Sequence, residues 1–486
     1  MHFAMVFHII SVLIMVIGGF MLFPLGIAVY NGEQAGIQAF MQTIAIVLLS
    51  GILLNSLTRK RKGKQFSAKD GFLMVTTSWI IASIAGALPF YFSGIIPSFA
   101  DAYFETMSGF TTTGASILTE IQSLPKSILF WRSLTHWLGG MGFVVLTVAI
   151  MPLLGIGGVK MVSAESPGPT MDKITPQITH MAKLLWFIYI GMTVLETVLL
   201  LFGGMNLFDS LTHTFGTLAT GGFSPKNASV GHYDSAYIDA VITIFMVLAG
   251  LNFGLYFRVL TGNLQELKKN TELKAYLLIF VVATLMAAIP LSGKIYSTFG
   301  ESLRFSSFQV ASIITTTGFA TTDFDIWPSF SKYILFGLMF IGGCSGSTGG
   351  GIKVIRIVTL FKQSVTEMKH LANPRGVFTT RMNGITIRKD FVYTVLGFVF
   401  LYIMLLLFTT AVVATSPGDY DLITSFSTAL ATVGNIGPGF SLVGPTMNYS
   451  FFPDYVKWFL SFAMMAGRLE IYTVLILFTP YFWRKH

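Results

Sequence analysis

Apolar runs of about 20 residues recur from one end of the chain to the other, and they limit its fold more than any other feature. A helix needs about 20 mostly apolar residues to cross a bilayer, so the runs predict transmembrane helices. The composition agrees, because 53% of the 486 residues are hydrophobic and 11% are charged, whereas soluble domains average about 25% charged. The sequence therefore predicts an all-α polytopic protein embedded in a lipid bilayer.

The charges predict which side of the membrane each segment faces. Most of the 31 Lys and Arg residues lie in segments 58–69, 154–183, 258–274 and 353–389 and at the C-terminus. The positive-inside rule places such segments in the cytoplasm, together with both chain ends. Residues 3–30 are too long for a signal peptide and lack a basic start, so they are expected to remain as a helix. Topology thus explains the net charge of +9, and nucleic acid is not an expected partner.

The chain repeats one arrangement four times. A full apolar span leads to a short segment of about a dozen residues, then to a Thr- or Gly-rich turn, then to a second span that contains glycine. The four turns read "TTTGAS" (111–116), "LATGGFS" (218–224), "TTTGFAT" (315–321) and "ATVGNIGPGFS" (431–441), and we align them on Gly114, Gly221, Gly318 and Gly434. An acid stands near the start of each short segment, as suits a helix N-terminus: Asp101, Asp209, Glu301 and Asp421.

This pattern predicts ten membrane crossings and four short helices that enter the membrane and return. Two N-terminal helices and a basic loop occupy residues 1–69. The four repeats occupy residues 70–183, 184–273, 274–388 and 389–486.

A turn inside the membrane leaves backbone carbonyls without partners, which is tolerated where protein covers them or where they line a water-filled cavity. Four such turns related by pseudo-fourfold symmetry would meet on one axis, and rings of carbonyls can replace the hydration shell of a cation. The residues expected to form this cation-binding filter are Thr112, Thr113, Gly114, Ala219, Thr220, Gly221, Thr316, Thr317, Gly318, Thr432, Val433, Gly434 and Asn435.

A carrier remains the alternative, because secondary transporters also contain broken helices. In that case the protein would be a cation symporter coupled to H⁺ or Na⁺ with the same fold. Such a carrier should keep ionisable groups near the middle of the bilayer. Only Glu196, Arg468 and Glu470 are plausible there, and none of them lies in a turn.

The segment "GGCSGSTGGG" (342–351) interrupts the second span of the third repeat. Its six glycines cannot hold a stable helix, since each costs about 1 kcal/mol relative to alanine. It could be a static break that lets helices pack closely. A phosphate-binding loop is a further alternative, although the run lacks G-x-x-x-x-G-K-[ST]. Arg468 is costly within a span unless it faces water or a partner, and neighbouring Glu470 is one candidate partner.

The four repeats, the glycine in each turn and the sequence "GGCSGSTGGGIKVIR" resemble the TrkH/KtrB/HKT superfamily of potassium-translocating proteins. The two extra N-terminal spans and the length are similar to the bacterial TrkH branch. The resemblance implies a potassium uptake subunit of a bacterial inner membrane, without enzymatic activity or an organic cofactor, and with potassium as the transported ion. It also implies a homodimer and a cytosolic TrkA-like ring of nucleotide-binding regulatory domains.

The resemblance also assigns roles to residues. Glycine rather than serine at all four aligned positions favours potassium over sodium. The glycine-rich segment is implied to be an intramembrane gate that blocks the pathway until it moves, with Arg468 as a positive charge below the filter that contacts it. The implied gate residues are Gly343, Cys344, Ser345, Gly346, Ser347, Thr348, Gly349, Gly350, Gly351 and Arg468.

Overall fold

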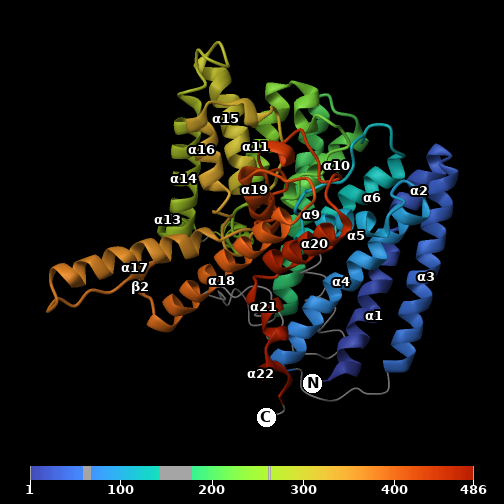
Figure 1. Ribbon diagram of the computed structural model, residues 1–486, viewed down its shortest axis with the longest axis horizontal. Helices are drawn as coiled ribbons and strands as arrows, with labels where there is room; N and C mark the ends of the chain where they lie inside the picture. Colours follow the sequence, from blue (N-terminus) through green and yellow to red (C-terminus); the bar gives the residue numbers. More distant parts are fainter. Residues whose placement is uncertain (1, 59–66, 143–177, 261, 263, 485–486) are drawn as a thin grey trace.

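The structure, a computed structural model, describes residues 2–58, 67–142, 178–260, 262 and 264–484 (Figure 1). Helices dominate these residues, as predicted, and β1 (Arg381–Met382) and β2 (Ile385–Thr386) pair as a short antiparallel hairpin. Within the described residues, six helical segments are long and apolar enough to cross a membrane, or eight if each of two bent helix pairs is one span.

The first two spans precede the repeats. Helices α1 (Phe3–Phe20) and α2 (Leu22–Asn31) together form one apolar segment of 29 residues, and α3 (Gln34–Thr58) returns alongside α1. They lie against α4 (Ala68–Phe92) and α6 (Lys126–Trp137) of the first repeat. The two N-terminal spans expected from the sequence are therefore present.

Four units of similar construction follow. Unit one contains α4 (Ala68–Phe92), α5 (Phe99–Phe110), α6 (Lys126–Trp137) and η2 (Leu138–Gly142). Unit two contains α9 (Ile178–Phe202), α10 (Leu207–Leu218), η3 (Ser229–Tyr233), α11 (Ala236–Ala249), α12 (Phe253–Leu260) and α13 (Leu264–Lys269). Unit three contains α14 (Thr271–Ala288), α15 (Phe299–Ile314), η4 (Phe324–Ile326), α16 (Ser329–Leu338), α17 (Val354–Ala372) and the hairpin. Unit four contains α18 (Lys389–Ala414), α19 (Leu422–Val433), η5 (Ser441–Val443), α20 (Asp454–Arg468), α21 (Tyr472–Leu475), η6 (Ile476–Phe478) and α22 (Pro480–Trp483).

The short helices α5, α10, α15 and α19 begin in the same way. A side-chain oxygen of the N-cap residue accepts a hydrogen bond from the backbone N–H three residues later, and the N-cap residues are Ser98, Asn206, Thr298 and Asp421. Such a cap is worth about 1 kcal/mol. The predicted acids are in place: three lie in the first helical turn and Asp421 is itself the cap.

The four units close into a ring. Each short helix packs against the first helix of its own unit, and α10, α15 and α5 pack against α6, α11 and α20 of the adjacent unit. The fourth junction joins α19 to α16, where the rings of Phe426 and Phe336 lie 5.9 Å apart. The turns that end the short helices are thereby brought to the centre of the bundle.

The second helix of each unit is irregular. Helices α11 and α12 meet at 94°, and α20 bends by 113° into the segment Tyr472–Phe478. In unit three, α16 stops at Leu338, and α17 begins only after the glycine-rich segment and projects from the bundle (Figure 1). The corresponding helix of unit one runs toward residues 143–177, which lie outside the described residues.

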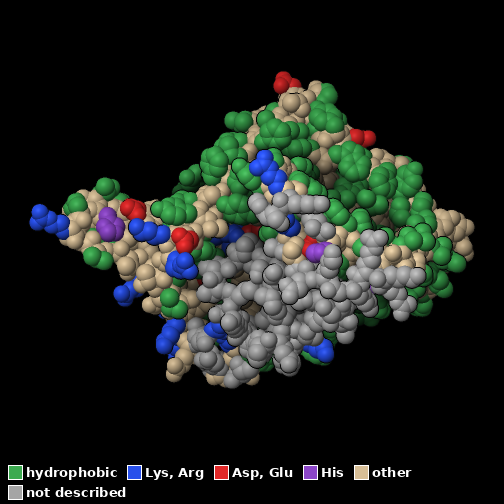
Figure 2. Space-filling model, turned by 90° about the horizontal axis from the view of Figure 1, so that it is seen from below, with side chains coloured by type: hydrophobic (Ala, Val, Ile, Leu, Met, Phe, Trp, Pro, Cys, Tyr) green, Lys and Arg blue, Asp and Glu red, His purple; other side chains and the backbone are tan. Residues whose placement is uncertain are grey.

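The first helix and the last described helix, α1 and α22, have their free ends at the same end of the molecule (Figure 1). Figure 2 looks onto this end, where Lys and Arg side chains project mainly along the left and lower edges of the view. The basic segments 58–69 and 154–183 of the topology prediction fall largely outside the described residues.

Candidate functional site

The four turns share one backbone conformation. The second residue after each short helix has a positive φ, of 52° to 59°: Thr112, Thr220, Thr316 and Asn435. The fourth residue is a glycine with φ of 80° to 96°: Gly114, Gly222, Gly318 and Gly437. The residue between them donates its N–H to a carbonyl five positions earlier, at 2.8–2.9 Å: Thr113, Gly221, Thr317 and Ile436. The turns are therefore structurally equivalent, residue by residue.

This equivalence corrects the sequence alignment in two of the four turns. The glycines that match Gly114 and Gly318 are Gly222 and Gly437, whereas the sequence alignment used Gly221 and Gly434. In unit four, α19 continues through Val433, so Thr432 and Val433 are helical and Gly434 is the C-cap with φ of −77°. In unit two, Gly221 is the central residue of the turn, and Ala219 is the C-cap of α10.

The four glycines face carbonyls of adjacent units in cyclic order. A Cβ atom added to any of them would approach a carbonyl oxygen to less than 3.0 Å, a separation that real Cβ atoms essentially never show. The pairs are Gly114 with Gly221, Gly222 with Thr317, Gly318 with Ile436 and Gly437 with Thr113. We call these eight residues the glycine–carbonyl ring. Since only glycine lacks Cβ and readily takes positive φ, the residue type here is fixed by geometry.

A hollow of about 130 Å³ adjoins the glycine–carbonyl ring. All four positive-φ glycines line it, together with residues of the loops that follow the turns. Four segments from distant regions of the sequence thus surround one small space, as the predicted convergence on an axis requires.

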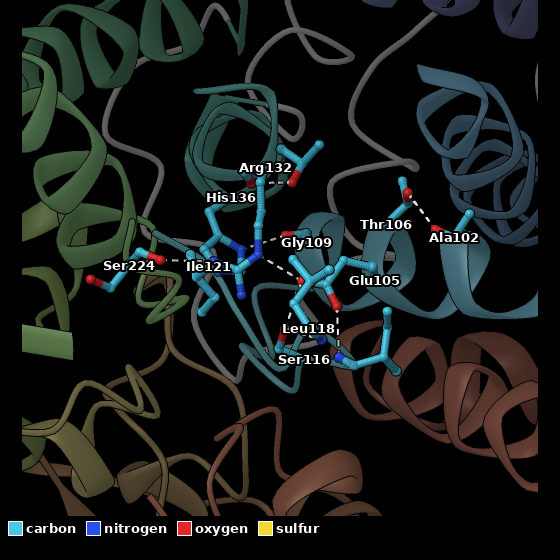
Figure 3. A network of polar contacts seen from close by, with 12 residues as sticks. Ala102, Glu105, Thr106, Gly109, Ser116, Leu118, Ile121, Arg132, His136 and Ser224 are labelled. Atoms are coloured by element: carbon cyan, nitrogen blue, oxygen red, sulfur yellow. Dashed lines mark hydrogen bonds and ion pairs between the residues drawn. The ribbon is translucent and has the colours of Figure 1, made fainter. Parts of the chain in front are cut away.

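A buried ion pair supports the first two turns (Figure 3). Arg132 on α6 places its Nε 2.6 Å from Oε1 of Glu105 on α5, and its Nη1 donates to the Ser224 carbonyl of unit two at 3.0 Å. The other oxygen of Glu105 accepts the backbone N–H of Ile117 at 2.9 Å. Both charged side chains are almost fully buried, and loss of one partner of such a pair costs about 3–5 kcal/mol.

Further polar and ring-stacking contacts fix the positions of the turns. His136 lies beside Gly221, with its Nδ1 2.7 Å from the Gly109 carbonyl and its ring stacked on Phe223 at a centroid distance of 4.0 Å. Asn435 of unit four donates from Nδ2 to Oγ1 of Thr113 in unit one at 2.9 Å, which ties the last turn to the first. Rigid support of this kind is what a precisely spaced ring of carbonyls needs.

The glycine-rich segment lies directly beside the turns, at the C-terminal ends of the short helices. Thr348 donates from Oγ1 to the Leu218 carbonyl at 2.9 Å, and the Gly350 N–H donates to Oγ1 of Thr316 at 2.7 Å. A Cβ on Gly350 would lie 2.6 Å from the Gly434 carbonyl oxygen. The segment is therefore packed against three of the four units at this level, and glycine allows the close approach.

Two cations contact carbonyls of this segment. Arg468 at the end of α20 donates to the Thr348 carbonyl and, at 3.0 Å, to the Gly139 carbonyl of unit one. Lys353 donates from Nζ to the Gly349 carbonyl. Glu470, the acid that the sequence offered as a partner for Arg468, forms an ion pair with Arg356 at 2.5 Å.

The fold and the site together define a class: a multi-pass membrane transport protein in which four re-entrant turns surround a central ring of carbonyl groups. Residues 36–485 match the TrkH family, described as "Cation transport protein". The chain belongs to the TrkH family of transport proteins.

Individual proteins of this family are similar to the chain over its whole length. The chain is 39% identical to the Trk system potassium uptake protein TrkH of Escherichia coli (strain K12) over 490 residues, covering 100% of both chains. It is 34% identical to TrkG of the same organism, covering 100% of this chain and 99% of that protein. The crystal structure of the potassium transporter TrkH from Vibrio parahaemolyticus superposes with a TM-score of 0.89 at 37% identity, with both chains fully covered.

The sequence prediction missed several residues that the structure places in the site. Gly222, Ile436 and Gly437 belong to the glycine–carbonyl ring, and Lys353 and Glu272 contact the glycine-rich segment. A signal for Gly437 was present, because "GPG" in the fourth turn marks a break that a helix cannot continue through. Glu272 carried no comparable signal, since an acid in the first turn of a helix is common.

Proposed function

We propose that this protein takes up potassium ions across a bacterial inner membrane through the glycine–carbonyl ring. The observation that carries the proposal is the cyclic order in which four equivalent turns face one another around a common space. Carbonyls held in this way substitute for the water that a cation loses on entry. The short helices add to the effect, because all four direct their negative C-terminal ends toward the ring. The names of the similar proteins support potassium as the ion.

Residues 343–351 of the glycine-rich segment act as the gate in this proposal. It lies against the ends of the short helices, where it obstructs a path leading from the ring. Arg468 and Lys353 hold its carbonyls, and their charges would oppose a cation leaving the ring. Opening requires these contacts to break, so the gate can be controlled by whatever moves the segment.

The proposed setting follows the family resemblance. The protein works as a homodimer with both termini in the cytoplasm, and a cytosolic TrkA-like nucleotide-binding ring controls the gate. In this proposal the chain is divided as predicted from the sequence: two N-terminal helices and a basic loop in residues 1–69, then four repeats in residues 70–183, 184–273, 274–388 and 389–486.

Recording from the purified protein in planar bilayers tests this function against ion-coupled symport. A pore gives discrete current steps above about a thousand ions per second, beyond typical enzyme-scale turnover. In mixed potassium and sodium, the reversal potential should move toward the potassium equilibrium potential. Current that requires a proton or sodium gradient, without discrete steps, would instead support the symporter.

A further inference from the structure

Glu272, in the first turn of α14, contacts both sides of the glycine-rich segment. Its Oε1 accepts the backbone N–H of Ser345 at 2.7 Å and the backbone N–H of Ile355 at 3.1 Å. Only 7% of the residue is exposed. One carboxylate oxygen therefore joins the beginning of the segment to the start of α17, and it closes the intervening residues into a loop.

The charges around this loop are complementary. Glu272 holds N–H groups at its two ends, whereas Lys353 and Arg468 hold the carbonyls of Gly349 and Thr348 at its middle. Hydrogen bonds to ionised groups are about twice as strong as neutral ones. Glu272 also lies within electrostatic range of the cationic side chains of Lys353 and Arg356.

The start of α14 is also tied to the β-hairpin that follows α17. The N–H of Thr271 donates to Oδ1 of Asn383 at 2.8 Å, and the N–H of Asn383 donates to Oγ1 of Thr271 at 3.1 Å. The hairpin is attached to α17 in turn, since Lys362 donates from Nζ to the Arg381 carbonyl at 3.0 Å. Helix α17 and the hairpin project together from the bundle (Figure 1). We call them the arm.

These contacts connect the segment back to itself through the arm. The segment continues into α17, and α17 is hydrogen-bonded to the hairpin. The hairpin is hydrogen-bonded to the start of α14, where Glu272 accepts hydrogen bonds from Ser345 and Ile355. We propose that Glu272 is a positioning residue that latches the gate shut, and that the Asn383–Thr271 pair transmits movement of the arm to this latch. This proposal rests on the proposed gating function, and it adds the residues through which the gate is released.

The test uses Cys344, the single cysteine of the chain, as a reporter. It lies within the segment and is 1% exposed, so a positively charged methanethiosulfonate should label it slowly in the full-length protein. In Glu272→Gln, which keeps the size but removes the charge, we expect labelling at least tenfold faster. Asp390→Asn is the matched control, because Asp390 lies in the first turn of α18 and is largely exposed.

A second variant tests transmission from the arm. Asn383→Gly removes the side-chain acceptor while preserving the positive φ of 51° at this position. Labelling should rise at least threefold in this variant, and the double variant with Glu272→Gln should be no faster than Glu272→Gln alone. Fully additive effects would reject the transmission step.

Potassium flux, measured separately in proteoliposomes, distinguishes the latch from the proposed function. Faster labelling with increased flux and an unchanged potassium-to-sodium ratio supports the latch. Faster labelling in a protein that never conducts potassium supports the latch but overturns the proposed function. Labelling of Glu272→Gln within twofold of the parent and of Asp390→Asn overturns the latch. If Glu272→Gln does not yield a monodisperse protein, Glu272→Asp, which shortens the reach to Ser345 and Ile355, replaces it with the same criteria.

Discussion

Replacement of Gly437 by alanine is the sharpest test of the glycine–carbonyl ring. The new Cβ would lie 2.6 Å from the Thr113 carbonyl oxygen, so that oxygen must move by about 0.4 Å to reach 3.0 Å, the limit of real contacts. The positive φ of 96° adds strain, which costs a non-glycine residue about 1–2 kcal/mol. If displacement of one carbonyl costs as much as a hydrogen bond to a charged group, about 1.5–3 kcal/mol, potassium flux should fall roughly ten- to a hundredfold.

Gly293 provides the matched control for this experiment. Its φ of 74° is also positive, but a Cβ there would meet nothing within 4 Å. Gly293→Ala therefore carries similar backbone strain without touching the ring. Rubidium or potassium uptake into proteoliposomes, normalised to reconstituted protein, should fall in Gly437→Ala and stay within about twofold of the parent in Gly293→Ala.

Two results would refute this reasoning. Uptake by Gly437→Ala equal to that of the parent would show that the Thr113 carbonyl does not serve the permeating ion. An equal fall in both variants would show that backbone strain alone, and not the ring, explains the loss.

Three further variants follow from the same contacts. Arg468→Ala removes two charge-assisted hydrogen bonds, each worth about 1.5–3 kcal/mol. Basal current should therefore rise at least tenfold, and Arg468→Lys should be intermediate. Unchanged conduction and gating would exclude Arg468 from the gate. Glu105→Gln leaves the Arg132 charge unpaired in a buried site, at a cost of about 3–5 kcal/mol. The temperature of thermal aggregation should therefore fall well below that of the control variant Glu120→Gln. Equal temperatures would show that the ion pair is dispensable. Ser98→Ala removes the cap of α5 and should cost about 1 kcal/mol, seen as a small fall in the same assay without a change in ion selectivity; a loss as large as that of Glu105→Gln would contradict a simple capping role.

Much of the architecture could be predicted from the sequence because the underlying signals are local. Long apolar runs set the spans, and the acids Asp101, Asp209 and Glu301 lie in the first turn of short helices, as expected. The glycine-rich segment breaks its span because glycine disfavours helix, whatever surrounds it. These features depend on residues close together in the chain.

The register of the turns depends on where each short helix ends, and local sequence does not settle that. Thr432-Val433-Gly434 looks like a filter motif, yet packing within the bundle extends α19 through Val433 and moves the turn to Asn435-Ile436-Gly437. In unit two, adjacent glycines at 221 and 222 leave two registers open, and only the fold separates them. The alignment therefore found the turns but misplaced two of them.

Partners of buried charges were the least predictable feature of the site. Neighbouring Glu470 was the obvious candidate for Arg468, but Glu470 pairs with Arg356, and Arg468 reaches carbonyls of units one and three. Each of these contacts joins residues more than 100 positions apart in the sequence. Helix bends and re-entrant segments decide such pairings, so they could be read only from the assembled bundle.

The most direct measurement is anomalous scattering from crystals of this protein grown with rubidium, which substitutes for potassium. A rubidium peak on the axis between the carbonyl oxygens of Thr113, Gly221, Thr317 and Ile436 is the predicted result. Clear density for these four turns with no peak between them, or a peak only at side chains elsewhere in the membrane, would contradict a ring of backbone oxygens as the path of the ion.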